Sequence, residues 1–358
     1  DVEFAELGEL DADGKRVRRH GSWEAMPLSV AQDSVSGQAR AELVDIGAGT
    51  SAADYEGKDV RGKLVLTVSQ PGAVQDLAVG QYGAAGIVSY APNQKSAWWL
   101  EDDRLVRWGH LDSFKEPGTF AFMVNLRTAN AWKARLAAGE SIVMEAEVRA
   151  ERQPGEYVLV DASIPGSGEG APAEDEIIFT CHLDHPRPGA NDNASGCAAE
   201  LEAARTLKTL IDSGRLPRPA RTLRFIWPAE IEGSLIYLVE RGDVDRVLAN
   251  MHMDMVGGGP ETKSVFRISG GPISLPSFIA DVVHEIGHFV NQQTLTYASG
   301  EAADFPLVSA EGTKNPQLAV METLSLGSDH QVFNEGSFRI PGIYLHDWPD
   351  RYIHTNFD

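Results

Sequence analysis

The chain has 358 residues, more than one average hydrophobic core contains, so we expect two domains. Its 52 acidic and 31 basic side chains give a formal net charge of -21, which argues against a nucleic-acid partner because the phosphate backbone would be repelled. No apolar run approaches the ~18 residues that span a bilayer, which argues against a membrane partner. The two cysteines, Cys181 and Cys197, are too few for a disulfide framework, and neither belongs to a zinc-binding cysteine pair.

The chain begins at Asp1, without a Met and without a signal peptide. We expect that the native start has been removed or left out. Because removal of a secretion signal would produce such a start, we favour a secreted protein over a cytoplasmic one. Nothing in the sequence bears on the oligomeric state.

The N-terminal part of the chain divides into two segments. Residues 1–40 are polar and irregular in pattern, and residues 41–148 have the pattern of a small α/β module. The β-branched run at residues 63–68 predicts a strand, residues 73–82 fit a short helix, and residues 83–90 predict a turn into a second buried strand. A strand–helix–strand unit of this kind predicts a parallel pair of strands.

Two phrases in this module, RGKLVLTVSQPG and QYGAAGIVSY, resemble those of a protease-associated domain. The resemblance covers about 100 residues and implies a domain that helps to shape access to an exopeptidase site. An aromatic and charged stretch at residues 98–103 lies between its halves. We interpret that stretch as a packing cluster under a loop, with a substrate-contacting lid as the alternative.

We expect the catalytic domain at residues 149–358. A stretch rich in Gly, Ser and Pro at residues 164–172 has linker composition. After it, the patterns of strands and helices alternate. Strands are expected at 177–181, 223–227, 249–255 and 342–345, and helices at 198–211, 235–241 and 277–291. This alternation predicts a doubly wound mixed α/β sheet with helices on both faces and a site beyond the strand ends.

The first strand of this domain is followed by candidate metal ligands. His182 and Asp184 stand at its end, and Asp192 follows in a loop that opens a helix. Because alternate residues of a strand share a face, His182 and Asp184 can point into one pocket. Histidine and carboxylate suit zinc. A metal-bound histidine usually needs a carboxylate behind it to fix its tautomer, and Asp184 is placed to supply one.

Three later segments add the same chemistry. Glu230 and Glu232 follow the second strand, Asp254 closes the third, and His354 stands near the end of the chain. A carboxylate at such an apolar position is costly unless it is paired or ligated. A lone buried histidine or aspartate is more often structural, but that interpretation is weak for five ordered groups.

The order H-x-D, P-G-A-x-D-N-x-S-G, a Glu pair, M-D-M-x-G and H-T-x-x-D over residues 177–358 resembles the co-catalytic zinc aminopeptidases. That family also includes glutamate carboxypeptidase and glutaminyl cyclase. The resemblance implies two zinc ions. One would be held by His182, Asp192 and Asp254, and the other by Asp192, Glu232 and His354.

The same resemblance implies the remaining roles. Glu230 would be the general base, and Asp184 would orient His182. The segment Gly327–His330 with Phe333 is similar to the family's late substrate-side loop. It implies substrate-binding roles for two residues, Asp329 and His330.

The chain departs from the family in three places. Ile231 separates Glu230 from Glu232, whereas the family's acidic pair is usually adjacent, so the roles of base and ligand stay open between them. Ile353 stands where a tyrosine often helps to hold the tetrahedral intermediate, which makes Tyr352 the candidate substitute. The chain also stops soon after this segment, where family members often continue.

A competing motif is H-E-x-x-H at His284, Glu285 and His288, the signature of single-zinc peptidases. On a helix its two histidines share one face, and a third ligand would come from Glu301 or Asp304. So short a pattern also arises by chance. We therefore expect both histidines to be exposed on a surface helix and keep the single-zinc peptidase as an alternative.

The expected function is that of a zinc-dependent aminopeptidase, which hydrolyses the N-terminal bond of a peptide substrate through a metal-activated water. A non-catalytic binding module on the same fold is an alternative from another class. Carboxypeptidase and cyclase action share the same metal core, so the ligands do not separate them. Cobalt or manganese in place of zinc also stays open, as does the preference for a particular residue.

Overall fold

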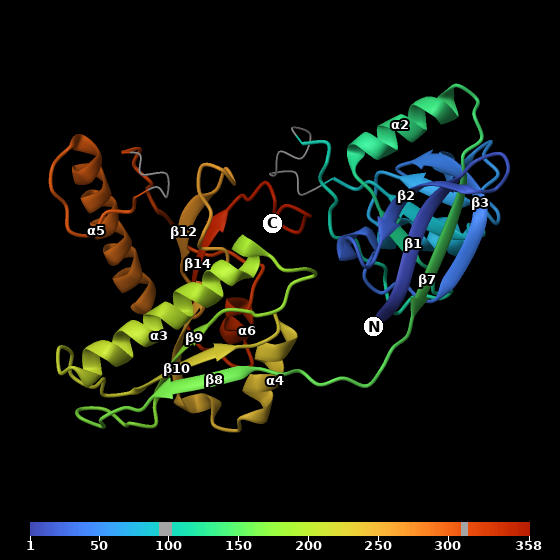
Figure 1. The fold of residues 1–358 in the computed structure, drawn as a ribbon. Coiled ribbons are helices and arrows are strands. Elements are labelled where there is room, and N and C mark those ends of the chain that lie inside the picture. Colours follow the sequence, from blue (N-terminus) through green and yellow to red (C-terminus); the bar gives the residue numbers. More distant parts are fainter. Residues whose placement is uncertain (93–101, 309–313) are drawn as a thin grey trace. The chain divides into compact units, whose positions relative to one another are not determined.

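The computed structural model describes residues 1–92, 102–308 and 314–358 (Figure 1). They form two compact units, one of Asp1–Gly155 with Arg351–Asp358 and one of Glu156–Asp350. Most of the aromatic and charged stretch at 98–103 lies outside the described residues. Within the described residues, no helix combines the length and the apolar character needed to cross a lipid bilayer.

The first unit is built on a seven-stranded sheet in the order β2-β1-β7-β3-β4-β5-β6. Its strands are β1 (Val2–Leu10), β2 (Arg16–Ser22), β3 (Gly37–Gly47), β4 (Leu64–Thr67), β5 (Gly86–Ser89), β6 (Ala121–Met123) and β7 (Val143–Ala150). Its helices are η1 (Pro27–Ser29), η2 (Ala52–Tyr55), α1 (Pro71–Gln75), η3 (Asp76–Gln81) and α2 (Leu126–Ala137). Strands β3 to β6 run parallel, whereas β1, β2 and β7 add antiparallel pairs.

The parallel strand–helix–strand unit predicted from the sequence is confirmed. Strand β4 pairs in parallel with β5, and α1 and η3 lie between them in the chain. Leu64 and Leu66 face one core cluster, whereas Val65 faces the other. A strand buried on both faces has a continuous apolar sequence, which is why the sequence pattern predicted β4.

The expectation that residues 1–40 are irregular is wrong, because they contain β1, β2 and the start of β3. Their charged side chains pair across strands. Glu6 on β1 forms ion pairs with Arg16 and Arg19 on β2. The apolar contribution comes from the other face, where Ala5 and Leu7 are buried. Cross-strand charge pairs stabilise such a ribbon, but the sequence shows them only as a polar stretch.

The second unit is built on a seven-stranded mixed sheet in the order β13-β12-β14-β11-β9-β10-β8. Its strands are β8 (Val160–Ile164), β9 (Glu176–Thr180), β10 (Thr222–Trp227), β11 (Val247–Met253), β12 (Val265–Ser269), β13 (Val320–Glu322) and β14 (Gly342–Trp348). Its helices are η5 (Ala190–Ser195), α3 (Gly196–Asp212), α4 (Glu232–Glu240), η6 (Val244–Arg246), α5 (Ile279–Ser299) and α6 (His330–Asn334). The four central strands β10, β9, β11 and β14 are parallel.

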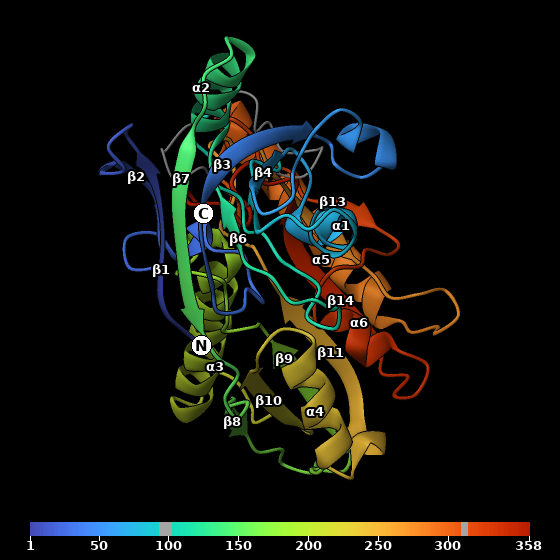
Figure 2. The ribbon, with the colours of Figure 1, turned by 90° about the vertical axis from the view of Figure 1, so that its right-hand side faces the viewer.

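Helices cover both faces of this sheet, which confirms the predicted mixed α/β fold (Figure 1). On one face, Leu238 of α4 and Ile178 of β9 belong to one buried apolar cluster, and Figure 2 shows the ribbons of α4 and β9. On the other face, Leu207 of α3 packs against the apolar cluster that contains Phe225. Because β9, β10 and β11 are parallel, their carboxyl ends meet at one edge of the sheet.

Candidate metal centre

Three potential metal ligands from three strand ends lie together at that edge. His182, Glu230 and Asp254 follow β9, β10 and β11, and their nearest donor atoms all lie within 4.8 Å of one another. His182 Nε2 lies 3.2 Å from Oδ1 of Asp254 and 3.2 Å from Oδ1 of Asp192. Atoms bound to one tetrahedral zinc at ~2.0–2.1 Å are about 3.3 Å apart, so this spacing fits a shared zinc ion.

The charge balance of the cluster also fits a cation. His182, Asp192 and Asp254 are all buried. Burial by itself lowers the pKa of His182, but the carboxylates of Asp184, Asp192 and Asp254 raise it well above its usual range. So many carboxylates around one buried imidazole require a positive charge among them. A divalent cation bound there would supply that charge in place of the imidazole proton.

The ring of His182 is oriented from behind by Asp184. Nδ1 of His182 makes a hydrogen bond of 2.9 Å with the main-chain oxygen of Asp184, so Nε2 faces the cluster. The carboxylate oxygen Oδ1 of Asp184 lies farther away, at 3.7 Å from Nδ1. That oxygen accepts a hydrogen bond of 2.7 Å from the main-chain N–H of Glu230. Asp184 therefore connects the first strand end to the second.

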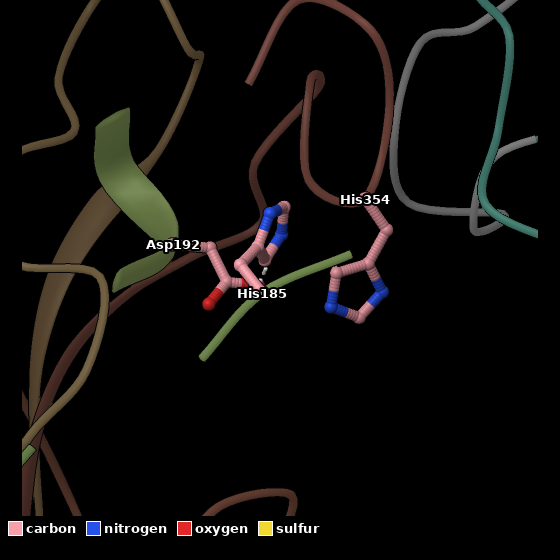
Figure 3. A group of neighbouring side chains, drawn as sticks. All are labelled: His185, Asp192 and His354. Carbon is pink, nitrogen blue, oxygen red and sulfur yellow. Dashed lines mark ion pairs between the residues drawn. The ribbon is translucent and has the colours of Figure 1, made fainter. Parts of the chain in front are cut away.

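Asp192 presents its two carboxylate oxygens to two histidines. Oδ1 faces His182, and Oδ2 lies 3.3 Å from Nε2 of His185, the ion pair drawn in Figure 3. His185 is oriented by a hydrogen bond of 2.6 Å between Nδ1 and the main-chain oxygen of Arg187. A carboxylate with one partner on each oxygen has the geometry of a bridging ligand.

His185 is a residue that the sequence reasoning missed. It stands three positions after His182 in the same loop, and no role was assigned to it. The readable signal was a second histidine in a loop that already contained an H-x-D pair. Its position beside Asp192 depends on the fold of the loop between β9 and α3, which no periodicity indicates.

The third side chain drawn in Figure 3, His354, belongs to the C-terminal segment of the first unit. Its main-chain oxygen accepts a hydrogen bond of 2.7 Å from Trp108 N–H, and its ring packs edge-on against the Trp108 ring. Tyr352 stands in the same segment and packs against Phe357. The ligand role of His354 and the substrate role of Tyr352 stay predictions.

Glu230 is held at a strained turn. Ile231, the next residue, has φ 64° and ψ −67°, and the N–H of Glu232 donates to the oxygen of Glu230 at 2.7 Å. This is a γ-turn of the rare positive-φ form, an unfavourable backbone state for a β-branched residue. Its N–H donates to Oδ1 of the fully buried Asp329 at 2.8 Å. Asp184 and Asp329 thus fix the backbone on both sides of the Glu230 side chain.

The environment of Glu230 suits proton transfer. Burial raises the pKa of Glu230 to about 8, the carboxylates of Asp254 and Asp192 add to the increase, and His182 opposes it. A carboxyl group with a pKa near neutrality can both accept and return a proton. By contrast, Glu232 begins α4, is exposed, and belongs to no metal-donor cluster among the described residues. The structure therefore brings Glu230, and not Glu232, to His182.

The late loop lies inside the unit, where it supports the cluster. Asp329 and His330 are both fully buried, and burial raises the pKa of Asp329 to about 6 and lowers that of His330 to about 4. His330 makes a hydrogen bond of 2.8 Å with the main-chain oxygen of Ser325, and its ring stacks on Tyr344 at 4.2 Å between ring centres. The predicted substrate-binding role of these two residues stays a prediction.

The H-E-x-x-H motif lies on α5, but the expectation that both of its histidines are exposed is wrong for His284, which is half-buried. His284 Nε2 makes a hydrogen bond of 3.0 Å with the main-chain oxygen of Ile268, whereas Glu285 and His288 are exposed. Across residues 1–92, 102–308 and 314–358, neither histidine takes part in a metal-donor cluster.

Comparison with solved structures identifies the fold. The chain is similar to an aminopeptidase from Aneurinibacillus sp. strain AM-1, with 21% identity, a TM-score of 0.52, and coverage of 99% of this chain and 73% of that one. The corresponding values are 20%, 0.59, 99% and 75% for BSAP, a zinc aminopeptidase from Bacillus subtilis. They are 19%, 0.57, 99% and 74% for a peptidase M28 precursor from Shewanella amazonensis SB2B.

Sequence comparison adds the family. No curated protein sequence matches the chain. Residues 160–358 match the model of peptidase family M28, which is more than half of the sequence and includes every residue of the cluster at His182. The chain therefore belongs to peptidase family M28.

Proposed function

We propose that this protein is a zinc-dependent aminopeptidase with two metal ions bridged by Asp192. The observation that carries the proposal is the arrangement around that carboxylate, with His182 on one oxygen and His185 on the other. Membership of family M28 supports peptide hydrolysis, and the fold is that of structures described as zinc aminopeptidases. The substrate class that follows is a peptide.

The first zinc would be held by His182, Asp192 and Asp254, whose donor atoms have the spacing of one coordination sphere. For the second zinc, we propose Asp192, His354 and His185. Glu232 is the ligand that the family resemblance implies there, but His185 is the donor that lies beside Asp192. The two proposed ligand sets for the second zinc differ only in whether His185 or Glu232 is the third ligand, which a single substitution of each residue tests.

The chain's own groups then divide the reaction between them. Bound zinc ions would lower the pKa of a water towards ~7 and polarise the scissile carbonyl. Glu230 would take a proton from the attacking water and return it to the leaving amine. Asp184 and Asp329 hold the Glu230 backbone, so the carboxyl stays aimed at the cluster. The acidic surroundings would attract the free α-amino group of a substrate, which favours cleavage at the N-terminus.

We also propose that residues 41–148 act as a protease-associated domain that shapes access to the site. The parallel strands β3 to β6 of the first unit are consistent with the α/β module that the sequence predicts. Residues 149–358 would be the catalytic domain, as the sequence pattern predicts.

The decisive experiment combines metal analysis with a Glu230→Gln variant. We expect two zinc ions per chain and a loss of turnover of about 10²–10⁴-fold without loss of metal. The matched control is Glu285→Gln, which alters the exposed glutamate of the H-E-x-x-H motif and should leave turnover unchanged. A chain with one zinc that disappears in His284→Ala would instead establish the single-zinc peptidase.

Substrate tests separate the remaining alternatives. Release of p-nitroaniline from aminoacyl p-nitroanilides, blocked by a chelator, would support the aminopeptidase. Cleavage only of N-blocked peptides from the C-terminal end would support a carboxypeptidase. Cyclisation of an N-terminal Gln peptide would support a cyclase. No reaction of any kind by metal-replete protein would favour a binding module.

A further inference from the structure

The two cysteines of the chain lie side by side next to the metal centre. Cys181 immediately precedes His182 at the end of β9 and is fully buried, whereas Cys197 is the second residue of α3 and is half-buried. Their Sγ atoms are 2.7 Å apart. Cys197 Sγ also lies 3.1 Å from the main-chain oxygen of His182. The thiols are therefore in contact with each other and with the backbone of a proposed ligand.

We propose that Cys181 and Cys197 are a redox modification site, at which a reversible disulfide closes the loop that carries the metal donors. A disulfide bond is about 2.05 Å long, so a movement of about 0.7 Å brings the two sulfurs to bonding distance. The loop between them contains His182, His185 and Asp192. Because the chain has only two cysteines, no other intramolecular disulfide competes.

The surroundings allow the pair to react. Cys181 packs among apolar side chains of β9 and β10, so it is inaccessible to a bulky reagent. Cys197 is the more exposed sulfur and is the entry point for an oxidant. Glu200 is fully buried beside Cys181, and burial raises the pKa of its carboxyl to about 9. That carboxyl is therefore neutral at pH 7 and places no negative charge against the attacking sulfur.

The oxidant that this chemistry needs is a small disulfide. Cys197 Sγ loses its proton to solvent and attacks one sulfur of that disulfide, which releases one small thiol and leaves a mixed disulfide on Cys197. Cys181 Sγ then attacks the Cys197 sulfur and gives its proton to the leaving small thiolate, which departs as the second small thiol. The two protein thiols are oxidised by two electrons, and one small disulfide is reduced to two thiols.

The consequence concerns the loop between the cysteines. A cross-link from the end of β9 to the start of α3 limits how far His182 and Asp192 can separate when the loop opens. Oxidation should therefore slow the departure of a bound metal ion, and reduction should speed it. This consequence rests on the proposed metal centre, whereas formation of the disulfide does not.

The first experiment counts thiols in the full chain after incubation with glutathione disulfide at increasing ratios to glutathione. We expect two free thiols in the reduced protein, none after oxidation, a mass lower by two hydrogens, and a tryptic product that joins the peptides of Cys181 and Cys197. Two thiols that persist in excess oxidant would overturn the proposal. So would a glutathione adduct that stops at Cys197, or a disulfide-linked dimer on a non-reducing gel.

The second experiment compares oxidised and reduced wild-type protein, so it does not depend on a variant that folds. We expect oxidation to raise Tm by about 5–10 °C and to slow transfer of Zn²⁺ to a chromogenic chelator by about tenfold. Cys197→Ser is the control in which the oxidant should change neither quantity. Equal Tm and equal zinc release in the two redox states would overturn control of the loop. If the chain binds no zinc, the proposed function fails, but the thiol count and the Tm comparison still test the disulfide. Failure of the proposed function is therefore distinguishable from failure of the redox proposal.

Discussion

The hydroxyl of Tyr344 donates a hydrogen bond of 3.2 Å to Oδ2 of Asp254, and Oδ1 of the same carboxylate faces His182. One oxygen of Asp254 is thus fixed by the protein, and the other is directed at the cluster. Tyr344 comes from β14, the parallel neighbour of the strand that Asp254 follows. A contact of this kind determines how a ligand is oriented before any metal binds.

Replacing Tyr344 by Phe should weaken zinc binding by about 10–100-fold, because Asp254 loses the partner that orients it. Competition with a chromogenic chelator measures this affinity. Tyr55→Phe is the matched control, since the Tyr55 hydroxyl is also buried and bonded, to the oxygen of Gly49 in the first unit. Equal zinc affinity in the two variants would show that Tyr344 only packs.

Removing the carboxylate of Asp329 should reduce turnover more than it affects substrate binding. In Asp329→Ala, the N–H of Ile231 loses its acceptor, the γ-turn relaxes, and Glu230 is no longer aimed at the cluster. We expect kcat to fall by about 10–100-fold with KM nearly unchanged. Asp329→Asn keeps an acceptor oxygen and should recover most of kcat. A change in KM alone would instead indicate direct substrate contact.

The second zinc site can be assigned by comparing two variants. His185→Ala should lower the metal content from two zinc ions to one, because His185 lies beside the outer oxygen of Asp192. Glu232→Ala should keep two, since that side chain is exposed at the start of α4. Metal analysis after dialysis reads both results directly. The reverse pattern would restore Glu232 as the ligand.

A pH-dependent contribution to stability is expected at the start of β9. Glu176 is buried there, and its carboxylate receives hydrogen bonds from Arg224 and Arg241. Burial by itself raises the pKa of Glu176, but the two guanidinium groups lower it below its usual value of 4.5. The carboxylate therefore stabilises the fold fully above pH ~4.5, and this stabilisation disappears as the pH falls through the lower pKa of the folded state.

Glu176→Gln should accordingly cost about 1.5–3 kcal/mol of unfolding free energy at pH 7, because both guanidinium groups lose their hydrogen bonds to this carboxylate. Arg224 keeps its ion pair with Asp161, and Arg241 keeps its ion pair with Asp243, so neither charge is left alone. The difference between the two proteins should shrink below pH ~4.5. Urea unfolding followed by circular dichroism at several pH values measures it. Glu202→Gln is the control, as the partner of Arg205 on the exposed face of α3, and should change stability by less than ~1 kcal/mol. A cost that grows on acidification would contradict the assignment.

The parts of the fold that follow from local pattern were predictable from the sequence. Strands β4, β5, β9 and β10 are apolar runs with turn residues around them. The ends of β9 and β10 correctly predicted that His182 and Glu230 lie at one edge of the second sheet. The N-terminal ribbon was not predictable, because its stabilisation comes from charge pairs between strands. Such pairs become visible only when the register is known.

The details of the site depended on backbone geometry that no residue pattern encodes. The main-chain oxygen of Asp184, and not its carboxylate, makes the close contact with His182. The γ-turn at Ile231 separates the directions of Glu230 and Glu232, so the inserted residue is part of the geometry of the acidic pair. His185 was visible in the sequence but needed the folded loop to gain a role.

The division of the chain has a practical consequence for anyone who wishes to isolate the peptidase half. Residues 351–358 follow the last strand of the second unit but pack with the first, where Trp108 holds the backbone of His354. A fragment starting after Gly155 would carry His354 without the residues that fix it. A fragment ending at Asp350 would lack it altogether. The first unit is built from two separate stretches of the polypeptide, so no single cut separates the two units with both of them complete.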